Sequence, residues 1–103
     1  MKKSIFIVDD EPAILKLLTH WVQNEWEYDV RTFTNGNDLL ESIDENPDLI
    51  LLDIMLPDLS GTDLLPRIKR MNKYLPVIML SAQGNIDVAL ECIRNGAYDY
   101  FPK

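Results

Sequence analysis

Hydrophobic residues along this chain form short runs separated by longer amphipathic segments. The runs at 5–8, 49–52 and 77–80 are continuously apolar, which is typical of strands covered on both faces. Apolar and polar residues alternate over 28–33, and we predict further short strands there and at 98–101. The pattern therefore predicts five strands.

The first segment between strands has apolar residues at helical spacing. Pro12 suits the first turn of a helix, where its missing N–H would have no partner. We predict a helix over 12–24. Its core face is expected to carry Ile14, Leu17, Leu18 and Trp21.

Turn-forming residues bound the second and fourth helices. Asn35-Gly36-Asn37 supplies a turn and a cap, and Asn46-Pro47 ends the second helix. Gly84-Asn85 introduces the fourth helix and Gly96 ends it. The apolar positions are Leu39, Leu40 and Ile43 in the second, and Ile86, Ala89, Leu90, Ile93 and Ala97 in the fourth.

The third helix contains Pro66, which restricts where that helix begins. Proline is tolerated near a helix start because few backbone N–H groups there have intrahelical partners. Thr62 or Asp63 is therefore the expected cap. The residues expected to face inward are Leu64, Leu65, Ile68 and Met71.

Strands that alternate with helices indicate βα units and an α/β fold. We predict a doubly wound five-stranded parallel sheet. Crossovers in such sheets are right-handed, so the four predicted helices must lie over both faces.

Composition places the chain among ordinary globular domains. Its 103 residues fit one domain over 1–103, with 47% hydrophobic and 26% charged residues. The net charge of −7 argues against direct nucleic-acid binding and against an anionic membrane surface.

Cysteine content and hydropathy bear on the cellular compartment in which the protein is expected to lie. Cys92 is the only cysteine, so no internal disulfide forms, and its place beside Ile93 favours a packing role over a reactive thiol. The first apolar run is too short for a signal-peptide core, and acids interrupt the later runs before a membrane span is reached. We expect a cytoplasmic protein.

Acidic residues follow two of the predicted buried strands. Asp9 and Asp10 come directly after the first run, and Asp53 closes the run at 49–52. Parallel strands place their carboxyl ends at one edge of the sheet, so the three acids are expected to converge. Clustered carboxylates need a counter-charge, for which Mg²⁺ is the natural candidate.

Ser81 and Lys103 follow the fourth and fifth predicted strands and belong to the same edge. A hydroxyl and an ammonium beside a metal suit a phosphoryl group, whose transfer depends on positioning and charge neutralisation. Asp53 is the best nucleophile candidate because it stands alone at a central strand end.

Four segments together resemble the receiver domains of bacterial two-component response regulators. They are Ile7-Val8-Asp9-Asp10-Glu11-Pro12, the stretch 53–61 (DIMLPDLSG), Leu80-Ser81-Ala82 and the stretch 96–103 (GAYDYFPK). The resemblance covers essentially the whole chain and implies a flavodoxin-like sheet with strand order 2-1-3-4-5. Ser81-Ala82-Gln83-Gly84 and the stretch 98–103 look similar to receivers that precede ATPase-type transcription activators.

The resemblance implies roles for the acids. Asp53 would accept a phosphoryl group from a sensor histidine kinase and form an acyl phosphate. Asp10 would bind Mg²⁺ directly, and Asp9 would act through a metal-bound water. The backbone carbonyl of Met55 would complete the protein's ligands.

The resemblance also implies a switch. Lys103 would pair with a phosphoryl oxygen, Ser81 would move to hydrogen-bond the phosphoryl group, and Tyr100 would turn inward into the space left behind. The changed surface, expected at the fourth helix and fifth strand, would reach an effector domain or a homodimer partner and so regulate transcription.

One departure concerns the end of the chain. Receivers normally continue after the position of Lys103 with a proline and a fifth helix. One sheet face should therefore lack cover, which implies partner binding, chain exchange or a truncated chain. C-terminal truncation is the interpretation we favour.

Two other functions fit the same residues. A Mg²⁺-dependent phosphohydrolase would also use a strand-end aspartate nucleophile, but Met55 stands where a general acid would be needed. A non-phosphorylated interaction module on this fold would normally lack one of the site residues, and none is missing. We therefore predict a phosphoacceptor signalling domain rather than an enzyme.

Overall fold

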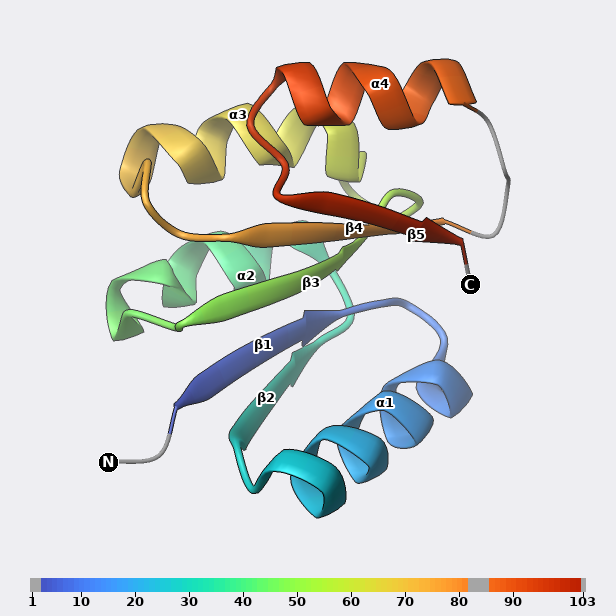
Figure 1. The fold of residues 1–103 in the computed structure, drawn as a ribbon, viewed down its shortest axis with the longest axis vertical. Coiled ribbons are helices and arrows are strands. Elements are labelled where there is room, and N and C mark those ends of the chain that lie inside the picture. The colour runs from blue at the N-terminus through green and yellow to red at the C-terminus, as the bar shows by residue number, and fades with distance from the viewer. Residues whose placement is uncertain (1–2, 82–85, 103) are drawn as a thin grey trace.

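The structure is a computed structural model that describes residues 3–81 and 86–102 (Figure 1). Lys103 and the segment 82–85, which includes Gln83, lie outside the described residues. The elements, in chain order, are β1 (Ser4–Val8), α1 (Pro12–Trp26), β2 (Asp29–Phe33), α2 (Gly36–Ser42), the short 3₁₀ helix η1 (Ile43–Glu45), β3 (Leu49–Asp53), α3 (Gly61–Met71), β4 (Val77–Ser81), α4 (Ile86–Arg94) and β5 (Asp99–Pro102).

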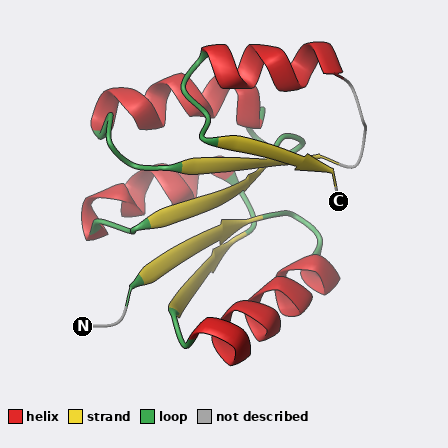
Figure 2. Ribbon diagram, in the orientation of Figure 1, coloured by secondary structure: helices red, strands yellow, loops and turns green. Residues whose placement is uncertain are grey.

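The five strands form one parallel sheet in the order β2-β1-β3-β4-β5. This confirms the predicted fold and strand order. Helix α1 lies on one face of the sheet, and α2, α3 and α4 lie on the other (Figures 1 and 2). The predicted distribution of helices over both faces is therefore also confirmed. None of the helices in the described residues is long and apolar enough to cross a membrane.

The larger core lies beneath α2, α3 and α4. Leu52, Leu64 and Met79 are fully buried there, and the rings of Phe6 and Phe33 meet edge to face with centroids 4.9 Å apart. The smaller core lies beneath α1 and consists of Ile5, Ile7, Leu15 and Val22.

The inward face of α1 differs from the prediction. Leu17 is 65% exposed and Trp21 is 48% exposed, so neither belongs to the core. The buried stripe instead runs through Leu15, Leu18 and Val22, at the same helical spacing but rotated around the axis. Two overlapping apolar stripes satisfy the same periodicity, and contact with β1 and β2 selects between them. The helix also continues to Trp26, beyond the predicted end at residue 24.

The start of α3 also differs from the prediction. Ser60, rather than Thr62 or Asp63, is the cap, and its Oγ accepts a hydrogen bond from the Thr62 N–H at 3.2 Å. Pro66 therefore lies inside the helix, past the first turn. The predicted inward residue Met71 is 54% exposed because it lies in the last turn, at the helix end.

Only a narrow face of helix α4 packs against the core. Cys92 is buried, as expected for a packing residue, and burial raises the pKa of its thiol. Three larger apolar residues of the predicted stripe stay exposed, and the helix ends at Arg94, before Gly96 with its φ of 106°. These exposed residues are Ile86, Leu90 and Ile93.

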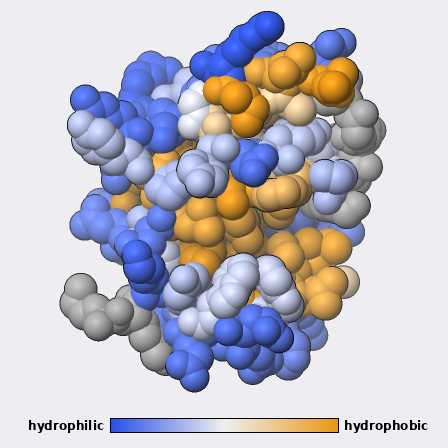
Figure 3. Space-filling view, viewed as in Figure 1, coloured by the Kyte–Doolittle hydropathy of each residue, from blue (hydrophilic) through white to orange (hydrophobic). Residues whose placement is uncertain are grey.

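The α1 face of the sheet carries an apolar groove of about 360 Å³ among the described residues, and the expectation that this face lacks cover stays a prediction. Figure 3 shows hydrophobic surface in the middle of this view, above α1. The rings of Trp21 and Trp26 meet edge to face at one side of the groove, with centroids 4.5 Å apart. The lining residues are Ile5, Leu18, Trp21, Val22, Trp26, Leu49, Leu51, Ile78, Leu80 and Phe101.

Candidate metal centre

The register of the sheet aligns the two acid-bearing strand ends. Val8 of β1 is paired with Leu52 of β3, so the next residues, Asp9 and Asp53, are level at the carboxyl edge. Neighbouring parallel strands end level with each other when their connections to the following helices leave the sheet at the same edge. The convergence expected from the sequence therefore follows from the pairing of β1 with β3.

Asp9, Asp10 and Asp53 form one cluster. Each offers a carboxylate oxygen, and these oxygens all lie within 4.8 Å of one another. Asp9 is fully buried and Asp53 is 3% exposed, whereas Asp10 faces solvent. Three oxygen donors, of which one is open to water, suit Mg²⁺, which keeps several of its own waters. The residues present therefore fit the expected ion.

Backbone hydrogen bonds hold Asp9 in place. Its Oδ1 accepts from the Glu11 N–H at 2.9 Å, and its own N–H donates to the Phe33 carbonyl at 3.0 Å. The first bond makes a tight turn between β1 and α1, so the two acids project from a fixed loop.

Backbone contacts join the two ends of the loop that follows Asp53. The Gly61 N–H donates to the Ile54 carbonyl at 2.7 Å, and Met55 forms an antiparallel bridge with Ser60. A Cβ at Gly61 would lie 2.4 Å from the Asp53 carbonyl oxygen, so only glycine fits without backbone movement. The Met55 N–H lies 3.4 Å from Asp53 Oδ1, a long hydrogen bond that turns the loop back over the carboxylate.

Asp58 has a structural role that the sequence analysis missed. Its carboxylate accepts hydrogen bonds from the N–H groups of Gly36, Asn37 and Leu59 at 2.8 to 2.9 Å. The bond from Gly36, with those from Asn37 and Leu59, holds the pKa of this carboxyl below its usual 3.8. The turn sequence around Pro57 favoured a polar residue here, but a partner at residue 36 has no local sequence signal.

The predicted switch residues lie on the two strands beyond β3. Ser81 is buried at the end of β4, opposite Pro102 of β5, and β4 lies beside the Asp53 strand. Tyr100 is half-buried and packs against the larger core. Lys103 follows directly after Pro102 in the chain, but its predicted role falls outside the described residues.

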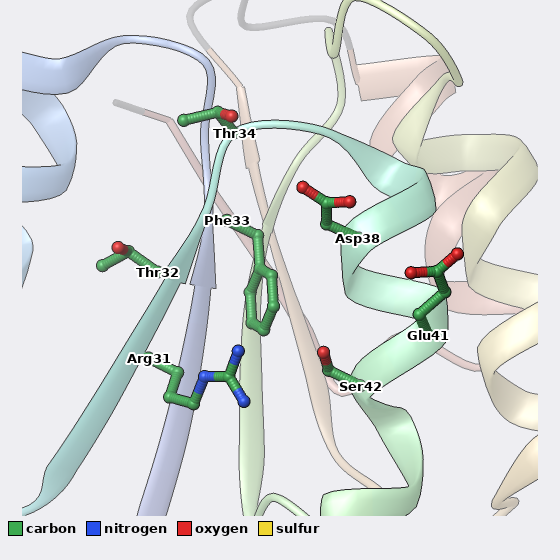
Figure 4. A pocket seen from close by; sticks show the side chains of 7 residues that line it. All are labelled: Arg31, Thr32, Phe33, Thr34, Asp38, Glu41 and Ser42. Carbon is green, nitrogen blue, oxygen red and sulfur yellow. The ribbon is translucent and has the colours of Figure 1, made fainter.

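A polar pocket between β2 and α2 is separate from the acid cluster (Figure 4). The Arg31 guanidinium lies over the rings of Phe33 and Phe6, 5.1 and 5.9 Å from their centroids, and forms an ion pair with Glu45. These contacts tie the edge strand to η1, so Arg31 has a packing role there.

A model of one known protein family matches nearly the whole length of the chain. Residues 5–103 match the family model described as the response regulator receiver domain. The chain belongs to this family. The match includes all but the first residue of β1, every later strand and helix of the described structure, and all three clustered acids, so this is a receiver domain with an Asp9, Asp10 and Asp53 site of the family's metal-binding type.

Related receiver domains occur in transcription regulators. The chain is 37% identical to the DNA-binding transcriptional regulator NtrC of Proteus hauseri over 99% of its own length and 22% of that protein. It is 42% identical to the nitrogen assimilation regulatory protein NtrX of Azorhizobium caulinodans over 100% of its length and 23% of that protein. These relatives confirm the narrower resemblance to receivers of ATPase-type activators, and the chain spans about a fifth of their length.

Solved receiver structures have the same fold. The crystal structure of the phosphorylated cyanobacterial phytochrome response regulator RcpA superposes with a TM-score of 0.91 at 30% identity. The alignment covers 100% of this chain and 81% of that one. The arrangement of strands and helices around the acid cluster is therefore that of known receivers.

Proposed function

We propose that this domain accepts a phosphoryl group on Asp53 from a sensor histidine kinase, in a reaction that requires Mg²⁺. The observation that carries the proposal is the convergence of three carboxylates within 4.8 Å at the end of the central strands. Asp53 is the one acid of the three on β3, flanked by strands on both sides, whereas Asp9 and Asp10 share the loop after β1.

The proposed chemistry divides the acids between two tasks. A carboxylate oxygen of Asp53 attacks the donor's phosphorus atom, an acyl phosphate forms, and the donor's histidine nitrogen leaves with the bonding electrons. Asp10 and the Met55 carbonyl would hold Mg²⁺ directly, and Asp9 would hold it through a water. The ion would neutralise phosphoryl oxygens that the carboxylates alone would repel.

Transmission of the signal would use residues on β4 and β5. Ser81 and Lys103 would contact the phosphoryl group, and Tyr100 would move inward as the Ser81 region shifts. Support comes from the adjacency of Ser81 and Pro102 in the sheet and from the partial exposure of Tyr100, which leaves its ring room to change position. The altered surface around α4 and β5 would act on an effector domain or on a second receiver, and through it on transcription.

The phosphohydrolase alternative finds less support. It requires a proton donor near Asp53, and the side chain two residues on is the thioether of Met55, 66% exposed to solvent. The related NtrC and NtrX proteins also bear regulatory rather than hydrolytic names.

Intact-mass spectrometry with a small acyl-phosphate donor tests the proposal. The protein should gain one phosphoryl group in the presence of Mg²⁺ and none when a chelator removes the ion. Asp53→Asn should gain none, because its amide is not a nucleophile. Asp63→Asn is the matched control, since it removes the same charge from an exposed site on α3 and should be phosphorylated like the parent.

Two results would contradict the proposal. Phosphorylation of Asp53→Asn at the parent level would show that another residue is the acceptor. Sustained release of phosphate over many turnovers would instead support the hydrolase, and a circular dichroism spectrum of each variant establishes that it is folded.

A further inference from the structure

A short segment is hydrogen-bonded both to the loop after β1 and to the loop after β3. It comprises residues 33–37, from the last residue of β2 to the first residues of α2, and we call it the brace. At one end the Phe33 carbonyl accepts the Asp9 N–H at 3.0 Å. At the other end the Gly36 and Asn37 N–H groups donate to Asp58 at 2.8 and 2.9 Å. The brace therefore contacts both the loop after β1 and the loop after β3.

Both oxygens of Asp58 take part in this connection. Oδ1 accepts from Gly36 and from Leu59, and Oδ2 accepts from Asn37. Bonds to both oxygens fix the orientation of a carboxylate as well as its position. The Asn35 side chain caps α2 by accepting a hydrogen bond from the Asp38 N–H, and Asp58 accepts from the Gly36 and Asn37 N–H groups, which this cap does not bind.

Close packing supports the same connection. A Cβ added at Gly36 would lie 2.8 Å from Leu64 Cδ1 and 3.2 Å from Leu59 Cβ. The brace thus lies against both the loop after β3 and the first turns of α3. The hydrogen bonds of Asp58 form where the chain is already in van der Waals contact, which leaves the loop little room to move.

Met55, whose backbone carbonyl is a proposed Mg²⁺ ligand, belongs to this loop. Met55 lies between Asp53 and Asp58, and its bridge to Ser60 fixes it relative to the base of the loop. Asp58 fixes the outer end. A loop held at both positions needs less ordering when an ion binds, and preorganisation of this kind increases affinity.

We propose that Asp58 is a positioning residue for the metal centre: by attaching the loop after β3 to the brace, it holds the Met55 backbone in the arrangement that binds Mg²⁺. The role in metal binding rests on the function proposed above. The attachment of the loop is a property of the metal-free protein and can be tested separately.

Amide hydrogen exchange of the metal-free protein tests the attachment. Asp58→Asn keeps one acceptor oxygen and so preserves a folded α2, whereas Asp58→Ala removes both. Exchange at Gly36 and Asn37 should accelerate in both variants, most in Asp58→Ala. The decisive amides are Met55 and Gly61, which make no bond to Asp58 and should also accelerate severalfold. Faster exchange confined to residues 36, 37 and 59 would overturn the proposal.

Mg²⁺ titration tests the role in binding. The dissociation constant should rise about tenfold in Asp58→Asn, the lower end of the range for residues that orient metal ligands. Phosphorylation should return to the parent level at saturating Mg²⁺. Asp63→Asn controls for the lost charge, and an equal rise in that variant would overturn the proposal.

The two measurements separate the possible failures. If the parent binds no Mg²⁺, the proposed function fails, and the exchange data still decide whether Asp58 holds the loop. If the parent binds Mg²⁺ and only the variants' melting temperatures fall, Asp58 is a cap for α2 and nothing more, and the inference fails alone.

Discussion

The two faces of the sheet contain equally apolar side chains but differ in how well they are covered. On the α2, α3 and α4 face, Leu52 and Met79 are fully buried. On the α1 face, their strand neighbours Leu51 and Leu80 are only partly buried and line the open groove. Helix cover, rather than side-chain hydrophobicity, therefore decides which residues of a strand form the core.

The acid cluster is attached mainly to the covered face. The loop after β3 reaches α2 through Asp58 and α3 through Gly61, and both helices pack on the larger core. Among the described residues, those that line the groove on the other face are all apolar or aromatic. Changes on the covered face should thus affect both stability and the site, and changes in the groove should affect neither strongly.

Leucine-to-alanine substitutions at adjacent positions of β3 should show the largest difference. Leu52→Ala leaves a cavity in the larger core and should lower the free energy of unfolding by about 3 kcal/mol. Leu51→Ala should cost about 1 kcal/mol, because its side chain is already partly in water. Urea unfolding measures both. Equal losses would show that the two faces are equally packed, contrary to the comparison.

Glycine-to-alanine substitutions around the site should give the next largest effect. Gly61→Ala places a Cβ against the backbone of Asp53 and Ile54 and should cost about 2 kcal/mol, with weaker Mg²⁺ binding. Gly36→Ala meets side-chain atoms of Leu64 and Leu59 rather than backbone, and side chains can adjust more readily than backbone, so its cost should be smaller, about 1 kcal/mol. A larger loss at Gly36 in thermal unfolding would contradict this order.

Acid titration should reveal the contribution of Asp58. The folded-state pKa of this carboxyl is lowered by its backbone hydrogen bonds, so the folded protein binds fewer protons here than the unfolded chain. Its stabilising effect is therefore complete above the ordinary value of 3.8 and is lost as the pH falls through the lower, folded-state pKa. Unfolding midpoints of the parent and of Asp58→Asn should converge in that acid range. A gap that stays constant with pH would be inconsistent with this effect.

Trp21→Gln should have the smallest effect on stability. The ring is 48% exposed at the rim of the groove, so the free energy of unfolding should fall by only about 0.5 kcal/mol, the low end for a pair of aromatic rings such as Trp21 and Trp26. Binding of a hydrophobic fluorescent dye should fall, because the groove loses one of its aromatic walls. Unchanged dye fluorescence would show that the dye does not occupy the groove.

Much of the fold and the acid cluster could be predicted from local sequence patterns. Continuous apolar runs identified the strands, and Asp9, Asp10 and Asp53 could be grouped because parallel strands end at one edge. The inward faces of α1 and α4 could not be predicted, because Leu17 and Ile93 satisfy helical spacing as well as Leu15 and Cys92 do. Contact with particular strands decides between such stripes.

Long-range polar contacts also could not be predicted from the sequence. The bonds from Asp58 to Gly36 and Asn37 join residues more than twenty positions apart. Ser60 caps α3 in place of the predicted Thr62 or Asp63, since the fold of the preceding loop fixes where the helix begins. These contacts lie in the loops around the site, whereas its three clustered acids could be identified from the sequence.

The most direct test of the central claim is to locate the phosphoryl group by peptide mapping. Borohydride reduces an aspartyl phosphate to homoserine, which marks the acceptor permanently. After reaction with an acyl-phosphate donor and Mg²⁺, the account predicts homoserine at residue 53 and unmodified Asp9 and Asp10. Homoserine at position 9 or 10, or a label at 53 that forms equally well without Mg²⁺, would contradict it.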